Sequence, residues 1–254
     1  RNQGLEIVKG DFVALLDADD VSPKHRLEKQ IVLLIENPEA VACFTGYWSF
    51  GPEGISKEYW ADRNGGVADS LSFLTGCRVL GASVVFHRLK CLGLRYPVGV
   101  NSGEDPIFCA LLRTRGEFIV VPEPLYGYRT RPGQASCRYT EMENFEQRLK
   151  WVRAHWAEYW PGMGLAEVER RMWLGLAETL GSFYWVRQRQ KFLDVRSYLR
   201  KNWPRHLQPA KECSLRWYPD WLWACKGWLD QLRGQQVSKK NQNTPAQFQS
   251  TNGG

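Results

Sequence analysis

Two groups of carboxylates carry most of the chemistry that this sequence could perform. The first group, Asp17, Asp19 and Asp20, directly follows the apolar run Phe12–Leu16. Such a run is typical of a strand buried on both faces, and ligands of open α/β sheets bind outside the carboxyl ends of strands. In an extended segment Asp17 and Asp19 face the same side, and two hard oxygen ligands suit Mg²⁺ or Mn²⁺ shared with phosphates. The alternative is a solvated loop that precedes a helix.

The second group is Glu104 and Asp105, which stand directly before Pro106. A carboxylate that is ionised at pH 7 can take a proton from an attacking hydroxyl group, so this pair could hold a general base at a helix start. Capping is the alternative, because Asp before a proline at the first helical position is a common helix start. Capping explains Asp105 well and Glu104 less well, and the residue types leave both interpretations open.

Alternating strand and helix patterns surround the two carboxylate groups. Ser22-Pro23 predicts the start of a helix that ends at Asn37-Pro38, and the Gly- and Ser-rich stretch Phe50–Asp69 predicts a long loop. The expected strands cover residues 12–16, 40–47, 79–87, 118–121 and 125–128, with Pro122 and Pro124 separating the last two, and a second helix covers 104–115. This alternation predicts an α/β layered domain.

Composition separates residues 1–139 from residues 140–254. The first part has 16 basic and 16 acidic residues, whereas the second has 18 basic and 11 acidic residues and therefore carries the whole formal net charge of +7. We expect an α/β domain at 1–139, a helical region at 140–232 and a disordered tail at 233–254. The apolar fraction of 43% is enough for a core. The sequence contains no run of 18 apolar residues, so we predict no membrane-spanning helix.

The second part is rich in tryptophan and is predicted to be helical. The expected helices cover residues 141–159, 165–188, 192–201 and 217–232, and helical spacing relates Trp151, Trp156 and Trp160 as well as Met172, Leu176 and Leu180. Such stripes are typical of helices that pack on a core. The segment Arg216–Trp228 mixes tryptophan with basic residues, which favours contact with a membrane surface. The same composition could stack nucleic-acid bases, but the scattered arginines and the lack of a nucleic-acid motif argue against that partner.

The seven cysteines are odd in number and include no C-x-x-C pair. They predict neither a disulfide framework nor a zinc site, so the simplest interpretation is a reducing compartment. We therefore expect a cytoplasmic protein that contacts the inner membrane face peripherally through its basic helices.

Several short segments occur in the order typical of one enzyme family. The segments are Arg1-Asn2-Gln3-Gly4, Lys9-Gly10-Asp11-Phe12, Leu16-Asp17-Ala18-Asp19-Asp20, Leu27-Glu28-Lys29-Gln30, Gly103-Glu104-Asp105, Gly116-Glu117-Phe118, Pro122-Glu123-Pro124-Leu125 and Tyr128-Arg129. Together they resemble the central part of family 2 glycosyltransferases, which are inverting enzymes of the GT-A fold. The resemblance covers residues 1 to about 139 and implies a GT-A-like, Rossmann-like mixed sheet followed by the helical region.

The resemblance also implies roles for single residues. Asp17 and Asp19 would hold Mn²⁺ or Mg²⁺ on the diphosphate of a nucleotide-sugar donor, with Asp19 favoured as the direct ligand. Asp105 would be the base that deprotonates the acceptor hydroxyl group, and Glu104 would bind the acceptor or orient the loop. The other substrate-binding residues implied are Arg1, Asn2, Asp20 and Arg129, and Arg129 and Arg131 would steady the leaving diphosphate unless they are only surface charges.

The resemblance lacks the first part of the family pattern. The V-I-I-P strand and the V-D-D segment, which hold the nucleotide in that family, do not precede Arg1. We therefore expect a fragment that is unstable alone, because a truncated sheet exposes a strand edge. The absence of a Q-x-x-R-W motif favours transfer of a single sugar to a saccharide, lipid-linked or protein acceptor. Two alternatives remain, namely a non-catalytic transferase-like scaffold and a membrane or nucleic-acid adaptor built on the basic helices.

Overall fold

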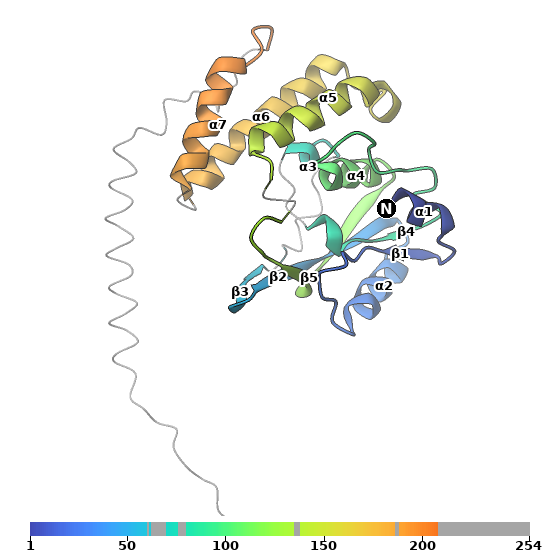
Figure 1. The fold of residues 1–254 in the computed structure, drawn as a ribbon. Coiled ribbons are helices and arrows are strands. Elements are labelled where there is room, and N and C mark those ends of the chain that lie inside the picture. The colour runs from blue at the N-terminus through green and yellow to red at the C-terminus, as the bar shows by residue number, and fades with distance from the viewer. Residues whose placement is uncertain (60, 62–69, 76–79, 135–137, 186–187, 208–254) are drawn as a thin grey trace, which may run out of the picture. The chain divides into compact units, whose positions relative to one another are not determined.

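A computed structural model describes residues 1–59, 61, 70–75, 80–134, 138–185 and 188–207. Its centre is a mixed sheet of five strands around the long strand β2 (Ala40–Gly51). Strand β5 (Glu117–Arg129) runs parallel to β2, whereas β3 (Gly54–Tyr59) and β4 (Val85–His87) pair with it in antiparallel fashion. The short strand β1 (Phe12–Ala14) pairs with β4 (Figure 1). The predicted α/β class is therefore confirmed.

The expectation that the first strand is buried on both faces was wrong. Strand β1 has only three residues and pairs with β4 alone among the described strands. Val13 is buried, while Phe12 is half-buried and Ala14 is exposed. An antiparallel strand at the rim of the described sheet needs only one covered face, so an apolar run does not distinguish it from a central parallel strand.

Two further predictions about strands need correction. The expected loop from Phe50 begins instead as a hairpin, in which β2 turns into β3 and Gly54 adopts a φ of 98°. The two strands expected on either side of Pro122 and Pro124 form one continuous strand, β5. The register shifts between Thr45 and Gly46 of β2, so the pairing passes over Pro122 and Glu123 and resumes at Pro124.

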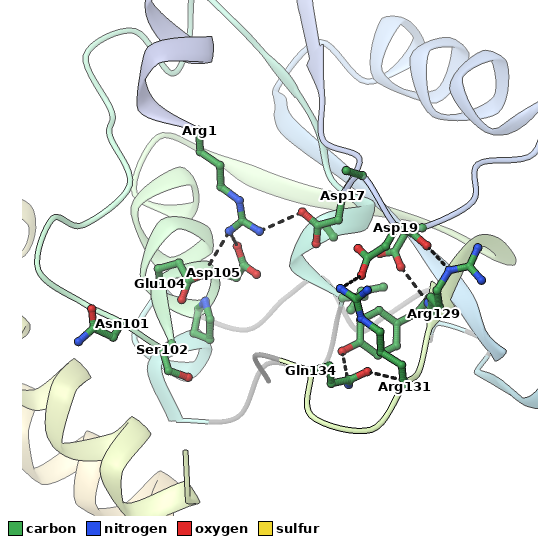
Figure 2. Close-up of a pocket in the computed structure, with 17 residues that line it drawn as sticks. Arg1, Asp17, Asp19, Asn101, Ser102, Glu104, Asp105, Arg129, Arg131 and Gln134 are labelled. Carbon is green, nitrogen blue, oxygen red and sulfur yellow. Dashed lines mark hydrogen bonds and ion pairs between the residues drawn. The ribbon is translucent and has the colours of Figure 1, made fainter. Parts of the chain in front are cut away.

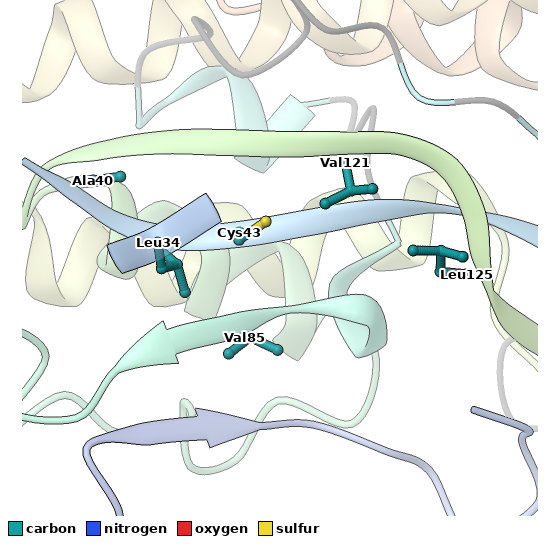
Figure 3. Close-up of a cluster of buried hydrophobic side chains, with 6 residues drawn as sticks. All are labelled: Leu34, Ala40, Cys43, Val85, Val121 and Leu125. Atoms are coloured by element: carbon teal, nitrogen blue, oxygen red, sulfur yellow. The ribbon is translucent and has the colours of Figure 1, made fainter. Parts of the chain in front are cut away.

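Helices cover both faces of the sheet (Figure 1). Helix α2 (Arg26–Glu36) packs on one face, where a cluster of buried residues joins it to three strands (Figure 3). The cluster consists of Leu34, Ala40, Cys43, Val85, Val121 and Leu125. Helix α4 (Glu104–Arg113) and the short α3 (Ser72–Thr75) cover the other face, where Phe44, Phe73, Phe86, Phe108 and Phe118 make aromatic contacts. Both long helices were predicted, although α2 begins after His25 and not at Pro23.

Two short elements were not predicted as such. Helix α1 (Asn2–Ile7) precedes the first strand, in a segment for which the sequence predicts no helix. A single 3₁₀ turn, η1 (Gly81–Ser83), replaces the beginning of the strand expected over 79–87, which is reduced to β4.

The predicted helical region follows the sheet. It contains α5 (Glu141–Tyr159), α6 (Leu165–Trp185) and α7 (Arg189–Asn202), with ends close to those expected. Trp151, Trp160, Met172, Leu176 and Leu180 are buried, as the helical spacing predicts, whereas Trp156 of the same stripe is only half-buried. Residues 1–208 form one compact unit, so the boundary expected after residue 139 stays a prediction. The expected helix 217–232, the segment Arg216–Trp228 and the tail 233–254 lie outside the described residues.

No helix among the described residues is long and apolar enough to cross a membrane.

A buried arginine connects α2 to the strand ends. Arg26 is 1% exposed, and its guanidinium group donates hydrogen bonds to the Leu15 carbonyl oxygen (2.8 Å) and to Gln30 Oε1 (2.9 Å). Gln30 in turn donates to the carbonyl oxygens of Cys43 (2.7 Å) and Ser83 (3.0 Å). Burial lowers the pKa of Arg26, but the group stays charged and its charge is satisfied by oxygen atoms of the backbone.

We predict that Arg26→Leu lowers the free energy of unfolding by about 3 kcal/mol, because several buried acceptors lose their donor. Urea denaturation measures the change. Lys24→Met is the matched control, since Lys24 is an exposed cation at the same end of the helix, and it should change stability by less than about 0.5 kcal/mol. Equal losses in the two variants would contradict the role given to Arg26.

Candidate active site

The two predicted carboxylate groups face each other across one pocket of about 490 Å³ (Figure 2). Asp17, Asp19 and Asp20 approach it from the loop after β1, and Glu104 and Asp105 approach it from the start of α4. Arg129 and Arg131 enter from the end of β5. The remaining lining residues are Arg1, Ala18, Leu80, Ala82, Asn101, Ser102, Gly103, Pro106, Tyr128 and Gln134.

Arg1 lies between the two groups of carboxylates. Its guanidinium group donates to Asp17 Oδ1 (3.1 Å), to Glu104 Oε1 (3.5 Å) and to Asp105 Oδ1. It also lies over the Tyr96 ring, 4.9 Å from the centroid. Burial alone would lower the pKa of Arg1, yet the surrounding negative groups, Asp105 foremost, raise it above its usual value. Arg1 therefore joins the loop after β1 to the start of α4 by charge.

Asp20 is held by strand β5. Its carboxylate accepts a hydrogen bond from the Tyr126 hydroxyl group (2.7 Å) and another from the Arg129 N–H group (2.8 Å). Burial raises the pKa of Asp20 and these two donors lower it, with burial prevailing. The pKa of Tyr126 is raised above its usual value, mainly by burial, so its hydroxyl group remains a donor. Asp20 therefore serves to fix the loop, whatever else it binds.

The arginines of β5 stand beside Asp19. The Arg129 Nε atom donates to the Asp19 carbonyl oxygen (2.6 Å), and its guanidinium group lies over the Phe50 ring at 4.5 Å. Arg131 forms an ion pair with the Asp19 carboxylate, at 2.9 Å between Nη2 and Oδ2. Both arginines are thus on the same side of the pocket as the carboxylates that could hold a cation.

Asp105 has the properties of a base poised near neutral pH. Burial raises the pKa of Asp105 to about 6, while Arg1 lowers it and Glu104 raises it further. The residue before α4, Gly103, has a φ of 87°, a conformation that favours glycine. A side chain at Gly81 would also meet Asp105, because its Cβ atom would lie 3.0 Å from that of Asp105. Two glycines therefore set the position of Asp105.

The structure brings together most of the residues that the sequence predicts for a site. Arg1, Asp17, Asp19, Asp20, Glu104, Asp105, Arg129 and Arg131 all line the pocket. Asn2 does not, because its side chain is bonded to the backbone of Tyr96. The Asn2 Nδ2 atom donates to the Tyr96 carbonyl oxygen (3.0 Å), and Asn2 Oδ1 accepts from the Tyr96 N–H group (2.8 Å). Its substrate contact stays a prediction. Sequence reasoning missed Asn101, Ser102, Tyr128 and Gln134; proximity to the Glu104-Asp105 segment was an available signal for the first two.

The chemistry of the pocket fits a divalent cation shared with a diphosphate. Five carboxylates line it against three arginines, which leaves an excess of two negative charges. No group of three His, Cys, Asp or Glu side chains that could hold a metal ion occurs among the described residues. Asp17 and Asp19 could supply two oxygen ligands, and Mg²⁺ is commonly bound by one or two carboxylates with substrate phosphates completing its coordination.

Comparison with known proteins identifies the first part of the chain. The model of the family described as glycosyl transferase family 2 matches residues 1–85. Residues 1–85 are therefore similar to this family. The family 2 segment carries Arg1, Asp17, Asp19 and Asp20, whereas Asp105 and Arg129 lie beyond it. The mixed sheet followed by helices agrees with the α/β fold that the sequence resemblance implies.

Two individual proteins are similar to this chain. One is the "Putative teichuronic acid biosynthesis glycosyltransferase TuaG" of Bacillus subtilis (strain 168), which is 43% identical over 54 residues. The match covers 21% of each chain, so this chain spans about a fifth of that relative. The other is the crystal structure of S. aureus TarS, with a TM-score of 0.45 and 15% identity, covering 69% of this chain and 30% of that chain.

We predict that Asp105 titrates at a pKa of about 6 and that its charged neighbours move this value in opposite directions. Arg1→Gln should raise the pKa, because it removes a positive charge that favours the carboxylate, and Glu104→Gln should lower it. Carboxyl ¹³C NMR of the labelled chain measures all three values. A base role then requires the activity to fall as the pH decreases through about 6. Titration of Asp105 near ~4, or equal shifts in both variants, would contradict this prediction.

Proposed function

We propose that the protein is a glycosyltransferase that transfers a single sugar, of the hexose type, from a nucleotide-diphospho-sugar to an acceptor hydroxyl group with inversion. The observation that carries the proposal is the pocket in which Arg1 spans the distance from Asp17 to Asp105. The match of residues 1–85 to glycosyl transferase family 2 supports glycosyl transfer as the reaction class. The diphosphate would lie on the side of Asp19 and the arginines, and the acceptor on the side of Asp105.

The proposed reaction is a single displacement. As the acceptor oxygen attacks the anomeric carbon, a new C–O bond forms, and the bond between that carbon and the diphosphate oxygen breaks. The electron pair of the broken bond leaves with the diphosphate, and the acceptor proton passes to Asp105. One base is sufficient, and attack opposite the leaving group inverts the anomeric centre.

The leaving diphosphate requires compensation of its negative charge. Asp17 and Asp19 would hold Mn²⁺ or Mg²⁺, which when bound neutralises charge on the diphosphate. Arg131 and Arg129 would assist, since guanidinium groups pair well with phosphate oxygens. Asp20 contributes indirectly by fixing the loop to Tyr126 and Arg129.

The setting of the reaction is also part of the proposal. The matched relative TuaG is named for teichuronic acid biosynthesis, which supports cell-surface polysaccharide biosynthesis and a saccharide or lipid-linked acceptor. Contact with the inner membrane face would bring the enzyme to a lipid-linked acceptor, and the excess of basic residues after residue 139 supports that contact.

We predict that Asp105→Asn lowers the rate of sugar transfer by about 10²- to 10⁴-fold, because the amide cannot accept the acceptor proton. Nucleotide binding, measured by calorimetry on the same preparation, should be unchanged. Asp11→Asn is the matched control, since Asp11 is exposed and does not line the pocket, and it should retain full activity. Undiminished transfer by Asp105→Asn would refute the base role, and no transfer by the unmodified protein would favour the non-catalytic scaffold.

Removal of divalent cations should abolish transfer, and added Mn²⁺ or Mg²⁺ should restore it. Binding of Mn²⁺ alone, followed by electron paramagnetic resonance, tests the ligands without any substrate. We expect Asp19→Asn to weaken Mn²⁺ binding by at least about tenfold, because one hard oxygen ligand is lost. Glu123→Gln is the control, since this carboxylate pairs with Lys29 outside the pocket. Unchanged Mn²⁺ affinity in Asp19→Asn would contradict the assignment.

A further inference from the structure

The wall of the pocket next to Glu104 is formed by two polar, uncharged side chains. Asn101 and Ser102 line it, and Figure 2 shows them on the Glu104 side, away from Arg129 and Arg131. Among the described residues, neither side chain has a hydrogen-bond partner. An amide and a hydroxyl group can each donate and accept, so together they match hydroxyl groups in either orientation. The part of the wall that Asn101 and Ser102 form carries no charged side chain, so it is suited to a polyhydroxyl acceptor and not to a diphosphate.

The backbone of this wall is attached to helix α5. The Asn101 N–H group donates a hydrogen bond to Gln147 Oε1 at 2.8 Å. Two residues later, Gly103 lies against the same helix, because a Cβ atom there would be 3.2 Å from Cγ of Arg148. Gly103 is also the residue from which α4 starts, so α5 supports both the wall and the segment that carries Asp105.

Helix α5 is stabilised by a cap at its start and by packing along its length. Thr140 begins it with a capping box, in which its hydroxyl oxygen accepts from the Glu143 N–H group (3.2 Å) and Glu143 accepts from the Thr140 N–H group (2.7 Å). Phe145, Leu149 and Val152 are buried along its inner side, and the Phe145 ring contacts Trp173 of α6 at 4.8 Å. A site built on packed elements of this kind holds its geometry well.

We propose that Asn101 and Ser102 form a subsite for hydroxyl groups of a saccharide acceptor and that Gln147 of α5 is the positioning residue for this subsite. The inference rests on the proposed function, since it takes Asp105 as the base that the acceptor must reach. It assigns the helical region a part in acceptor binding and not only in packing.

The test compares Gln147→Leu with Gln147→Glu in the full chain. Leucine has a similar size but cannot accept the hydrogen bond from Asn101, whereas glutamate keeps an accepting oxygen. A panel of nucleotide sugars with Mn²⁺ first identifies a donor that the enzyme hydrolyses with water as the acceptor. Transfer to p-nitrophenyl glycosides is then measured with that donor. Amide hydrogen exchange of residues 100–106 is measured in parallel without any substrate.

We expect Gln147→Leu to raise the KM for the glycoside by about tenfold, while hydrolysis and the KM for the donor stay within about twofold. Exchange of the Asn101 amide should become faster. Gln147→Glu should restore both values towards those of the unmodified protein. If Gln147→Leu fails to fold, Ser102→Ala replaces it in the test, because this change leaves the hydrogen bond between Asn101 and Gln147 of α5 in place. Ser102→Ala should also raise the KM for the glycoside.

Different failures have different meanings. An unchanged glycoside KM in Gln147→Leu, equal effects of leucine and glutamate, or a parallel fall of hydrolysis and transfer would each overturn the inference. Absence of both hydrolysis and transfer in the unmodified protein would instead refute the proposed function. In that case the exchange measurement still decides whether Gln147 positions Asn101.

Discussion

The site depends on the hydrogen bonds that the buried guanidinium group of Arg26 donates. Among the described residues no carboxylate pairs with this group, so carbonyl and amide oxygens that converge from several elements must solvate its charge. That requirement fixes the end of β1, the turn before β4 and helix α2 relative to one another. The Tyr126 ring lies 5.0 Å from the same guanidinium group, and its hydroxyl group holds Asp20. The buried charge of Arg26 therefore fixes the position of the loop with Asp17 and Asp19.

Charge also links the two sides of the pocket. Arg1 belongs to the family 2 segment and reaches Asp105, which lies beyond that segment. The proposed cation site and the proposed base are consequently not independent, because a change in the charge of one side alters the potential at the other. The excess of negative charge in the pocket remains after Arg1, Arg129 and Arg131 are counted, which is the condition that a divalent cation requires.

The sequence predicted which residues line the pocket better than it predicted the elements that hold them in place. Asp17, Asp19, Glu104 and Asp105 were found because their types and their places at element ends have a chemical meaning. The helices of the second part were found because their apolar spacing is long and regular. The continuity of β5 across its prolines could not be predicted, since it depends on a register shift against β2 that leaves Pro122 and Glu123 without a partner in that strand. The hydrogen bond from Asn101 to Gln147 could not be predicted from the sequence either, because no local pattern encodes a contact between residues 46 positions apart.

The parallel pairing of β2 with β5 has a consequence for the order of folding. It joins Ala40 to Glu117 and Phe50 to Arg129, so the second edge of the central strand is paired only after a long stretch of chain has been made. Asp20 receives both of its hydrogen bonds from that late strand. A nascent chain that ends at residue 85 would thus contain the matched family 2 segment with Asp20 unanchored and one edge of β2 open. The loop that carries Asp20 would be fixed only once β5 has paired with β2.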